Sequence, residues 1–299
     1  MAGQTRRRAR QYRARMQLFH PTTIDEAVAL LAAHDEARCI AGGQSLVAML
    51  NLGLLDPPAL VSLRKVEGLD RLTRHADGSV AMGAAVTQAA LASAGLPGAL
   101  AVLSEAAQQV AHPAIRNFGT VGGALCHADP AADLPPAFVA ADARLTAIGP
   151  DGARRIRAED FFLDYLTTAL AEDEILTEIR LPPPPPGSVG AYHKFARVDG
   201  DYATVSVAVA LTLEDGICRA ARVVLGSCAA QPLRLDAADA ALADTRLDGD
   251  AVARAGALLQ DAAEPLADMR GSADYRRRII PGLVARTVEA ARARSEAPA

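Results

Sequence analysis

The chain has 299 residues, of which 51% are hydrophobic and 22% are charged, and its formal net charge is −4. This length and apolar content are enough for about two domains with sizeable cores. A weakly acidic chain has no general attraction for nucleic acid or for an acidic membrane surface. Aromatic residues make up 4% of the chain and Trp is absent, so base-stacking platforms are not expected. The longest uncharged stretch, residues 39–55, contains Gly, Gln, Ser and Asn and does not resemble a membrane span.

The beginning of the chain is strongly basic. Six arginines lie between Arg6 and Arg15, and no apolar segment follows them, so a secretory signal is not expected. This composition predicts that residues 1–16 form a disordered, solvated extension. A targeting arm or a nucleic-acid-binding arm is the alternative interpretation.

The cysteines are widely spaced, at Cys39, Cys126, Cys218 and Cys228. Without a Cys-x-x-Cys pair, neither a zinc site nor an iron–sulfur cluster is expected on this chain, and we predict no metal site. Unpaired thiols are typical of a reducing compartment, and we expect a cytoplasmic protein without a transmembrane segment.

In chain order, the first expected helix begins at a capping box, Thr23 to Glu26, and its apolar stripe continues to Leu31. Residues 38–41 are expected to form a short strand that leads into a glycine turn, and residues 45–51 to form a single helical turn. The other elements expected before residue 182 are helices at 88–93, capped by Thr87, and at 98–110, and strands at 61–63, 79–83, 144–148 and 174–181.

Five consecutive prolines, Pro182 to Pro186, interrupt all regular structure and predict a semi-rigid connector. We place a domain boundary there, between residues 17–186 and residues 187–293, with a tail at 294–299. The second domain is expected to contain strands at 192–198, 203–213 and 217–225, followed by helices near 236–244, 250–263 and 272–293. Strands and helices in separate runs indicate an α+β domain.

Two glycine pairs stand out, in Ala41-Gly-Gly-Gln-Ser-Leu46 and in Thr120-Val-Gly-Gly-Ala124. A Gly-Gly pair allows the backbone to approach a ligand closely, and successive N–H groups in such a turn can bind an anion. Two such loops predict a dinucleotide whose diphosphate is held from both sides, although plain tight turns are the alternative. Because the chain has neither a Gly-x-Gly-x-x-Gly motif nor a P-loop, the commoner nucleotide folds are excluded.

The strings AGGQSLVAML at 41–50 and TVGGALCHADPAADLP at 120–135 resemble the FAD-binding medium subunit of molybdenum hydroxylases, the carbon monoxide dehydrogenase and xanthine dehydrogenase family. The resemblance runs from about Phe19 to Ala293. Its later landmarks are EILTEIRLP at 174–182, HKFARVDGDYATVSVAVAL at 193–211 and ADYRRRIIPGLVARTVEAA at 273–291.

The resemblance implies an α+β architecture with two domains. The first is a vanillyl-alcohol-oxidase-like (PCMH-type) FAD-binding domain made of two lobes. The second is an α+β domain like the C-terminal domain of the carbon monoxide dehydrogenase flavoprotein. The cofactor would be FAD, and Gln44 favours non-covalent binding, because some members of the wider fold tether the flavin through a His near this turn.

The resemblance also implies the residues that contact FAD. They are Ile40, Ala41, Gly42, Gly43, Gln44, Ser45, Leu46 and Val47 in the first loop, Gly119, Thr120, Val121, Gly122, Gly123 and Ala124 in the second loop, and Val110, Asp133, Leu176, Lys194 and Tyr202 elsewhere.

Several of these assignments have alternatives. Asp133 is suited to accept hydrogen bonds from sugar or ribityl hydroxyls, or it caps a helix at 134–140. Lys194 lies near the flavin ring, or it makes a surface ion pair. Tyr202 lies against the ring, or it fills the domain interface. Val110 and Leu176 would be core residues with or without a ligand.

Two further positions affect the expected site. The family commonly has Asn where this chain has Ala124, so a side-chain contact is lost and FAD binding is expected to be weakened, while the backbone donors of Gly122 and Gly123 remain. His127 is a possible tether or metal ligand, but we interpret it as a polar residue at the exit of the loop.

No catalytic side chain is expected on this chain, since it lacks Ser–His–Asp, Cys–His and His-Glu-x-x-His arrangements. The resemblance implies that a large molybdopterin subunit oxidises the substrate, a small [2Fe–2S] subunit relays electrons, and this chain passes them through FAD to an external acceptor. A dimer of such heterotrimers is expected. The alternatives are a self-contained flavin oxidase or dehydrogenase of the same fold, and a non-catalytic nucleotide-binding assembly subunit.

Overall fold

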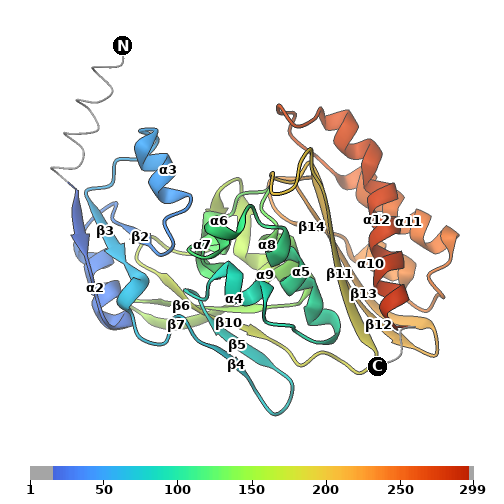
Figure 1. Ribbon diagram of the computed structural model, residues 1–299, viewed down its shortest axis with the longest axis horizontal. Helices are drawn as coiled ribbons and strands as arrows, with labels where there is room; N and C mark the ends of the chain where they lie inside the picture. The colour runs from blue at the N-terminus through green and yellow to red at the C-terminus, as the bar shows by residue number, and fades with distance from the viewer. Residues whose placement is uncertain (1–15, 296–299) are drawn as a thin grey trace.

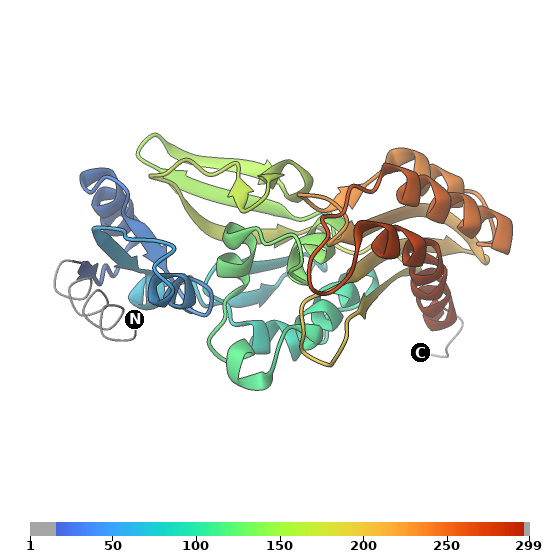
Figure 2. The same cartoon turned by 90° about the horizontal axis from the view of Figure 1, so that it is seen from above.

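The computed structural model describes residues 16–295, so the basic extension and the end of the tail lie outside the described residues. Three parts follow one another along the long axis of the molecule (Figures 1 and 2). We call them the N-terminal lobe (residues 17–69), the central lobe (residues 70–181) and the C-terminal layer (residues 188–295). Each has its own cluster of buried apolar side chains, and the cluster of the central lobe extends into the C-terminal layer.

The N-terminal lobe is a small parallel sheet covered by a helix. The sheet has the order β1 (Gln17–Phe19), β3 (Ala59–Ser62), β2 (Arg38–Ile40). Helix α2 (Ile24–Ala33) begins as the capping box predicts, since the Thr23 hydroxyl accepts a hydrogen bond from the Glu26 N–H at 3.2 Å. The Glu26 carboxylate accepts from the N–H of Thr22, one residue earlier than in the usual motif. The lobe is completed by η1 (Leu63–Lys65) and α3 (Leu46–Asn51).

The central lobe is an antiparallel sheet with the helices gathered on one side (Figure 1). The sheet has the order β4 (Leu72–Arg74), β5 (Val80–Gly83), β10 (Ile175–Leu181), β6 (Arg144–Gly149), β7 (Gly152–Arg157). The helices are α4 (Gln88–Ala92), η2 (Gly98–Leu100), α5 (Ala101–Gln109), α6 (Pro113–Arg116), α7 (Val121–His127), α8 (Leu134–Ala140) and α9 (Ala158–Phe161), and a small hairpin consists of β8 (Phe162–Asp164) and β9 (Thr167–Thr168). As predicted, Thr87 caps α4, accepting from the N–H of Ala90.

The second glycine pair differs from the expectation of a loop. Gly122 and Gly123 lie inside α7, which begins at Val121 and is capped by Thr120. The helix is not recognisable from propensity, since two glycines oppose helix formation. A hydrogen bond from the Gly122 N–H to the carbonyl of Ala84, which is distant in the sequence, stabilises the helix instead.

The C-terminal layer is an antiparallel meander of β11 (Ser188–Phe195), β12 (Val205–Glu214), β13 (Ile217–Gly226) and β14 (Leu233–Arg234), followed by α10 (Asp236–Leu242), α11 (Gly249–Ala262) and α12 (Ala273–Ser295). The predicted order of strands and helices is confirmed, although the first strand begins at Ser188 and ends at Phe195.

Both faces of this sheet are buried. Val205, Val207 and Val209 alternate along β12 and belong to the core beneath α10–α12. The opposite face contributes Tyr192 and Ala208 to the core that α5 and α8 of the central lobe help to form. A sheet covered on both sides couples the two parts that it separates.

Among residues 16–295, no helix is both long and apolar enough to cross a lipid bilayer.

Asp239 of α10 provides a test of the packing beneath this sheet. Its carboxylate accepts a hydrogen bond from the Val223 N–H at 2.8 Å and forms an ion pair with Arg234. Burial raises the pKa of Asp239 to about 6, against the opposing effect of these partners. The usual Asp pKa is about 4, so the folded state binds an additional proton between these values, and stability falls as the pH rises through them.

We therefore expect Asp239→Asn to flatten the stability profile between about pH 4 and pH 6, by on the order of 2 kcal/mol. Urea unfolding at several pH values measures the effect. Asp236→Asn is the control, because Asp236 pairs with the same arginine but its side chain is 90% exposed. Parallel profiles for the wild type and Asp239→Asn would contradict the expectation.

Candidate functional site

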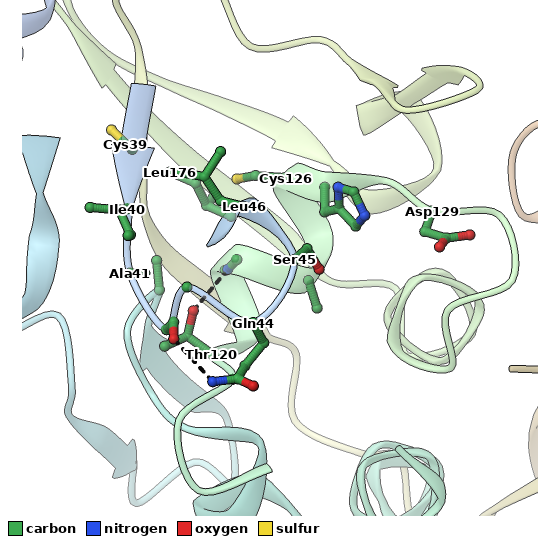
Figure 3. A pocket seen from close by; sticks show the side chains of 18 of the residues that line it. Cys39, Ile40, Ala41, Gln44, Ser45, Leu46, Thr120, Cys126, Asp129 and Leu176 are labelled. Atoms are coloured by element: carbon green, nitrogen blue, oxygen red, sulfur yellow. Dashed lines mark hydrogen bonds between the residues drawn. The ribbon is translucent and has the colours of Figure 1, made fainter. Parts of the chain in front are cut away.

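A cavity of about 870 Å³ lies where the three parts of the molecule meet. It lies within the size range of small-molecule and cofactor sites. Its walls come from residues 37–46 of the N-terminal lobe, from segments of the central lobe between residues 84 and 176, and from residues 200–202 of the C-terminal layer. Figure 3 shows the first glycine loop together with Thr120, Cys126 and Leu176, which also line the cavity.

The first glycine loop combines close backbone packing with unsatisfied donors. A Cβ added to Gly42 would lie 2.0 Å from the Phe118 carbonyl oxygen, so the loop touches the backbone of the central lobe at this point. Gly43 has a φ of +74°, which favours glycine. Among the described residues, the N–H groups of Gly43, Gln44 and Ser45 have no hydrogen-bond acceptor. Such a group of free N–H donors is suited to bind an anion.

The N–H groups of the second glycine pair have acceptors within the chain. The Gly122 N–H donates to the Ala84 carbonyl at 2.8 Å, and the Gly123 N–H donates to the Thr120 hydroxyl at 3.1 Å. A Cβ on Gly122 would lie 2.5 Å from the Cβ of Ala84. The prediction that both glycine pairs present free N–H donors is therefore wrong for the second pair. Gly122 allows α7 to pack directly against Ala84.

Gln88 is a cavity residue that the sequence analysis missed. Its side chain is buried beside Gly119, and its Oε1 atom has no hydrogen-bond partner within the described part of the chain. A buried polar atom without a partner is costly, so a ligand group that bonded to it would relieve the cost. The sequence feature that could have pointed to Gln88 is the cap at Thr87, because this cap places Gln88 at the first position of α4.

Asp133 lines the cavity but does not cap α8. It has helical backbone angles and makes no capping hydrogen bond. Its Oδ1 accepts from the Tyr192 hydroxyl at 2.6 Å, and its Oδ2 lies 3.1 Å from the Lys194 ammonium. Lys194 also donates to the Gln109 carbonyl. The Asp133 and Lys194 side chains are only 7% and 3% exposed, so the alternative of a surface ion pair is wrong. Burial raises the pKa of Asp133, while Lys194 and Tyr192 oppose the rise.

The structure gathers most of the predicted site residues around the cavity. Those lining it are Ile40, Ala41, Gly42, Gly43, Gln44, Ser45, Leu46, Val110, Gly119, Thr120, Gly122, Gly123, Ala124, Asp133, Leu176 and Tyr202. Three predicted residues are not among its lining residues. Val47 points to solvent, Val121 is fully buried in the core, and Lys194 lies behind Asp133.

Two thiols and an imidazole also line the cavity. Burial raises the pKa of the Cys39 and Cys126 thiols to about 12 each, so neither is a thiolate nucleophile at neutral pH. His127 ends α7 at the wall of the cavity. Within residues 16–295, no three His, Cys, Asp or Glu side chains are grouped so that they could hold a metal ion.

The contact at Gly42 gives a testable prediction. Gly42→Val should push the first loop away from Phe118, opening the cavity and lowering the melting temperature, because the new side chain overlaps backbone rather than a flexible side chain. Gly249→Val is the matched control, since nothing lies within 4 Å of its Cβ position and its φ is ordinary. Thermal unfolding and ligand titration measure the two effects. Equal behaviour of the two variants would show that the contact does not support the loop.

The comparisons with known proteins agree with this geometry. Residues 14–184 match the model of the FAD binding domain in molybdopterin dehydrogenase, and residues 190–291 match the CO dehydrogenase flavoprotein C-terminal domain. The chain is 38% identical over 278 residues to the carbon monoxide dehydrogenase medium chain of Afipia carboxidovorans, covering 92% of this chain and 96% of the relative. It is 37% identical over 269 residues to the 6-hydroxypseudooxynicotine dehydrogenase complex subunit alpha of Paenarthrobacter nicotinovorans, covering 89% and 90%.

Solved structures show the same relationship. A chain of the reconstituted CO dehydrogenase from Oligotropha carboxidovorans matches with a TM-score of 0.90 and 37% identity, covering 93% of this chain and 98% of that chain. A chain of quinoline 2-oxidoreductase from Pseudomonas putida 86 matches with a TM-score of 0.88 and 31% identity, covering 94% and 98%. The fold class and the family resemblance are thus confirmed, and the chain belongs to the FAD-binding medium subunits of molybdenum hydroxylases, as an oxidoreductase flavoprotein subunit.

Proposed function

We propose that this chain holds FAD non-covalently in the cavity and passes electrons from a [2Fe–2S] subunit to an external acceptor. The observation that carries the proposal is the set of free N–H groups at Gly43, Gln44 and Ser45, three residues that line a cavity of cofactor size. They suit the diphosphate of FAD, and the orphaned amide of Gln88 adds a polar group across the same cavity. Gln44 cannot form the covalent link that a histidine could.

The described side chains explain what the protein would contribute. Bound FAD supplies the hydride and single-electron chemistry. Leu176, Val110 and Ala124 give the cavity apolar walls that exclude water, and Asp133 is held in place by Tyr192 and Lys194. With the Cys39 and Cys126 thiols protonated, no catalytic side chain on this chain is proposed.

The remaining parts of the proposal concern assembly. The relatives are named as a medium chain and as a subunit of a dehydrogenase complex, which supports a complex with a small [2Fe–2S] subunit and a large molybdopterin subunit, arranged as a dimer of heterotrimers. Substrate choice would then belong to the large subunit. The four cysteines, all unpaired, favour a reducing compartment such as the cytoplasm. The proposed domain boundary, between residues 186 and 187, lies in the interval between the two family-model matches.

The proposal predicts that the purified chain carries or takes up FAD, which acid or heat releases, and that the chain alone turns over no substrate. Absorbance spectra of the chain, and of the supernatant after acid precipitation, measure the binding and release of FAD. Steady-state assays with aldehydes and N-heterocycles measure substrate turnover. Co-expression with a small [2Fe–2S] subunit and a large molybdopterin subunit should produce substrate-dependent flavin reduction. A chain that never binds FAD, or that oxidises substrate without partner subunits, would refute the proposal.

Gln88 allows the position of the diphosphate to be tested. Gln88→Glu places a negative charge at the orphaned amide, and Gln88→Met removes the polar atoms at similar size. Because the orphaned Oε1 is an acceptor, a diphosphate could bond only to the amide N–H group of Gln88. If it does, both variants lose that hydrogen bond, and Glu should weaken FAD binding about tenfold more than Met does, because its carboxylate also repels the diphosphate. Flavin fluorescence titration gives both affinities. Binding by Gln88→Glu as tight as that of the wild type would instead place a hydroxyl of FAD at this residue.

A further inference from the structure

One wall of the cavity is a segment of the C-terminal layer, and the partly exposed Tyr202 places this segment at the mouth of the cavity. Gly200, Asp201 and Tyr202 belong to the loop between β11 and β12, which we call the 196–204 loop, and all three line the cavity. A Cβ on Gly200 would lie 2.8 Å from the His112 ring and 3.0 Å from the Ala111 carbonyl. The loop therefore closes against the chain between α5 and α6.

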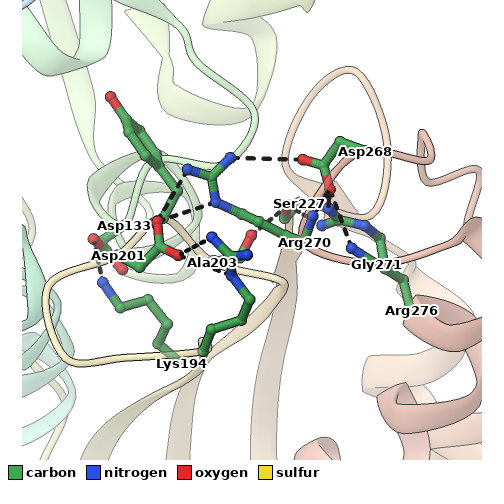
Figure 4. A network of polar contacts seen from close by, with 11 residues as sticks. Asp133, Lys194, Asp201, Ala203, Ser227, Asp268, Arg270, Gly271 and Arg276 are labelled. Carbon is green, nitrogen blue, oxygen red and sulfur yellow. Dashed lines mark hydrogen bonds and ion pairs between the residues drawn. The ribbon is translucent and has the colours of Figure 1, made fainter.

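Arg270 contacts this loop through Asp201 (Figure 4) and is not among the residues that line the cavity. Its Nε and Nη2 atoms donate to Asp201 Oδ1 at 3.1 and 3.0 Å. Its guanidinium carbon lies 5.2 Å from the centre of the Tyr202 ring, within the range of a cation–π contact. The Tyr202 N–H also donates to Asp201 Oδ1, at 2.8 Å. One arginine thus engages both the carboxylate and the ring of adjacent residues.

Arg270 is itself held in position. Its N–H donates to Asp268 Oδ1 at 2.8 Å, and the same oxygen accepts from Arg276. The Arg276 side chain is 3% exposed and also donates to Ser227 and to the Thr204 carbonyl, at the end of the 196–204 loop. The segment that carries Arg270 and the base of the loop are therefore anchored at the same buried guanidinium.

The other attachments of the loop are backbone contacts and one exposed ion pair. The Ala203 N–H donates to the Ala131 carbonyl at 3.4 Å, and the Ala203 carbonyl accepts from the Ser227 hydroxyl at 2.9 Å. Arg197 contacts Asp201 Oδ2 at 3.3 Å, but its side chain is 53% exposed, and exposed ion pairs stabilise little. Val198 is 67% exposed, and Tyr202 is 46% exposed. The Arg270 side chain is only 23% exposed and its partner Asp201 is 13% exposed, so this pair is the better shielded of the two.

We propose that Arg270 is a positioning residue for the flavin site, which clamps Asp201 and Tyr202 across the mouth of the cavity and so slows the departure of bound FAD. The inference depends on the proposed function, since it takes FAD as the occupant of the cavity. A lysine could not replace the arginine, because a point charge cannot pair with a carboxylate and stack on a ring at once.

The test compares Arg270→Met with Arg278→Met. Arg278 makes the same type of contact, 5.5 Å from the centre of the Tyr275 ring, and does not line the cavity. In the FAD-free chain, Arg270→Met should speed amide hydrogen exchange of residues 196–204. In the FAD-loaded chain it should raise the FAD dissociation rate about tenfold, equivalent to ~1.4 kcal/mol. Arg278→Met should change neither quantity.

Tyr202→Ala distinguishes a clamp from a general loss of stability. If Arg270 acts through the ring, the Arg270→Met change should accelerate FAD release far less in the Tyr202→Ala background than in the wild type. Unchanged loop exchange in Arg270→Met, or equal effects in Arg278→Met, would overturn the inference. If the wild-type chain retains no FAD, the proposed function fails, and the exchange measurement on the FAD-free chain still decides whether Arg270 holds the loop.

Discussion

The structure depends on places where two backbones touch and no side chain can intervene. Gly42 brings the N-terminal lobe against the Phe118 carbonyl, and Gly122 brings α7 against Ala84. These contacts hold the walls of the cavity together, and the three residues after Gly42, whose N–H groups have no acceptor among the described residues, line it. Contacts within the protein, as much as any ligand, require glycine at these two positions. The cavity is therefore a consequence of how the parts pack.

Features set by neighbours in the sequence could be predicted. The caps at Thr23 and Thr87, the alternation around Val205 and the break at the prolines each depend on a few adjacent residues. The misjudged features depend on residues far apart in the chain. Helix α7 contains two glycines but is stabilised by the hydrogen bond from Gly122 to Ala84. Lys194 is buried because it pairs with Asp133, 61 positions away. No local pattern encodes such pairings.

The buried pair at Asp133 also links the cavity to the C-terminal layer. Asp133 precedes α8 of the central lobe, whereas both of its side-chain partners, Tyr192 and Lys194, lie on β11. Removing one member of a buried pair leaves an uncompensated charge, which costs about 3–5 kcal/mol. The same sheet is packed on both faces. The layer is thus part of the cavity wall and of the core behind it, rather than an appendage.

The sheet buried on both faces has a consequence for biosynthesis. While the nascent chain is still on the ribosome, α5 and α8 have no β11–β13 surface to cover them, and Asp133 has no lysine. The opposite face of the sheet is covered by α10 and by α12, which ends at Ser295. Domains of a growing chain generally fold in the order of their synthesis. Here, however, the packing of the central lobe is complete only after the C-terminal layer has been synthesised. A prematurely terminated chain would therefore leave the apolar faces of α5 and α8 uncovered.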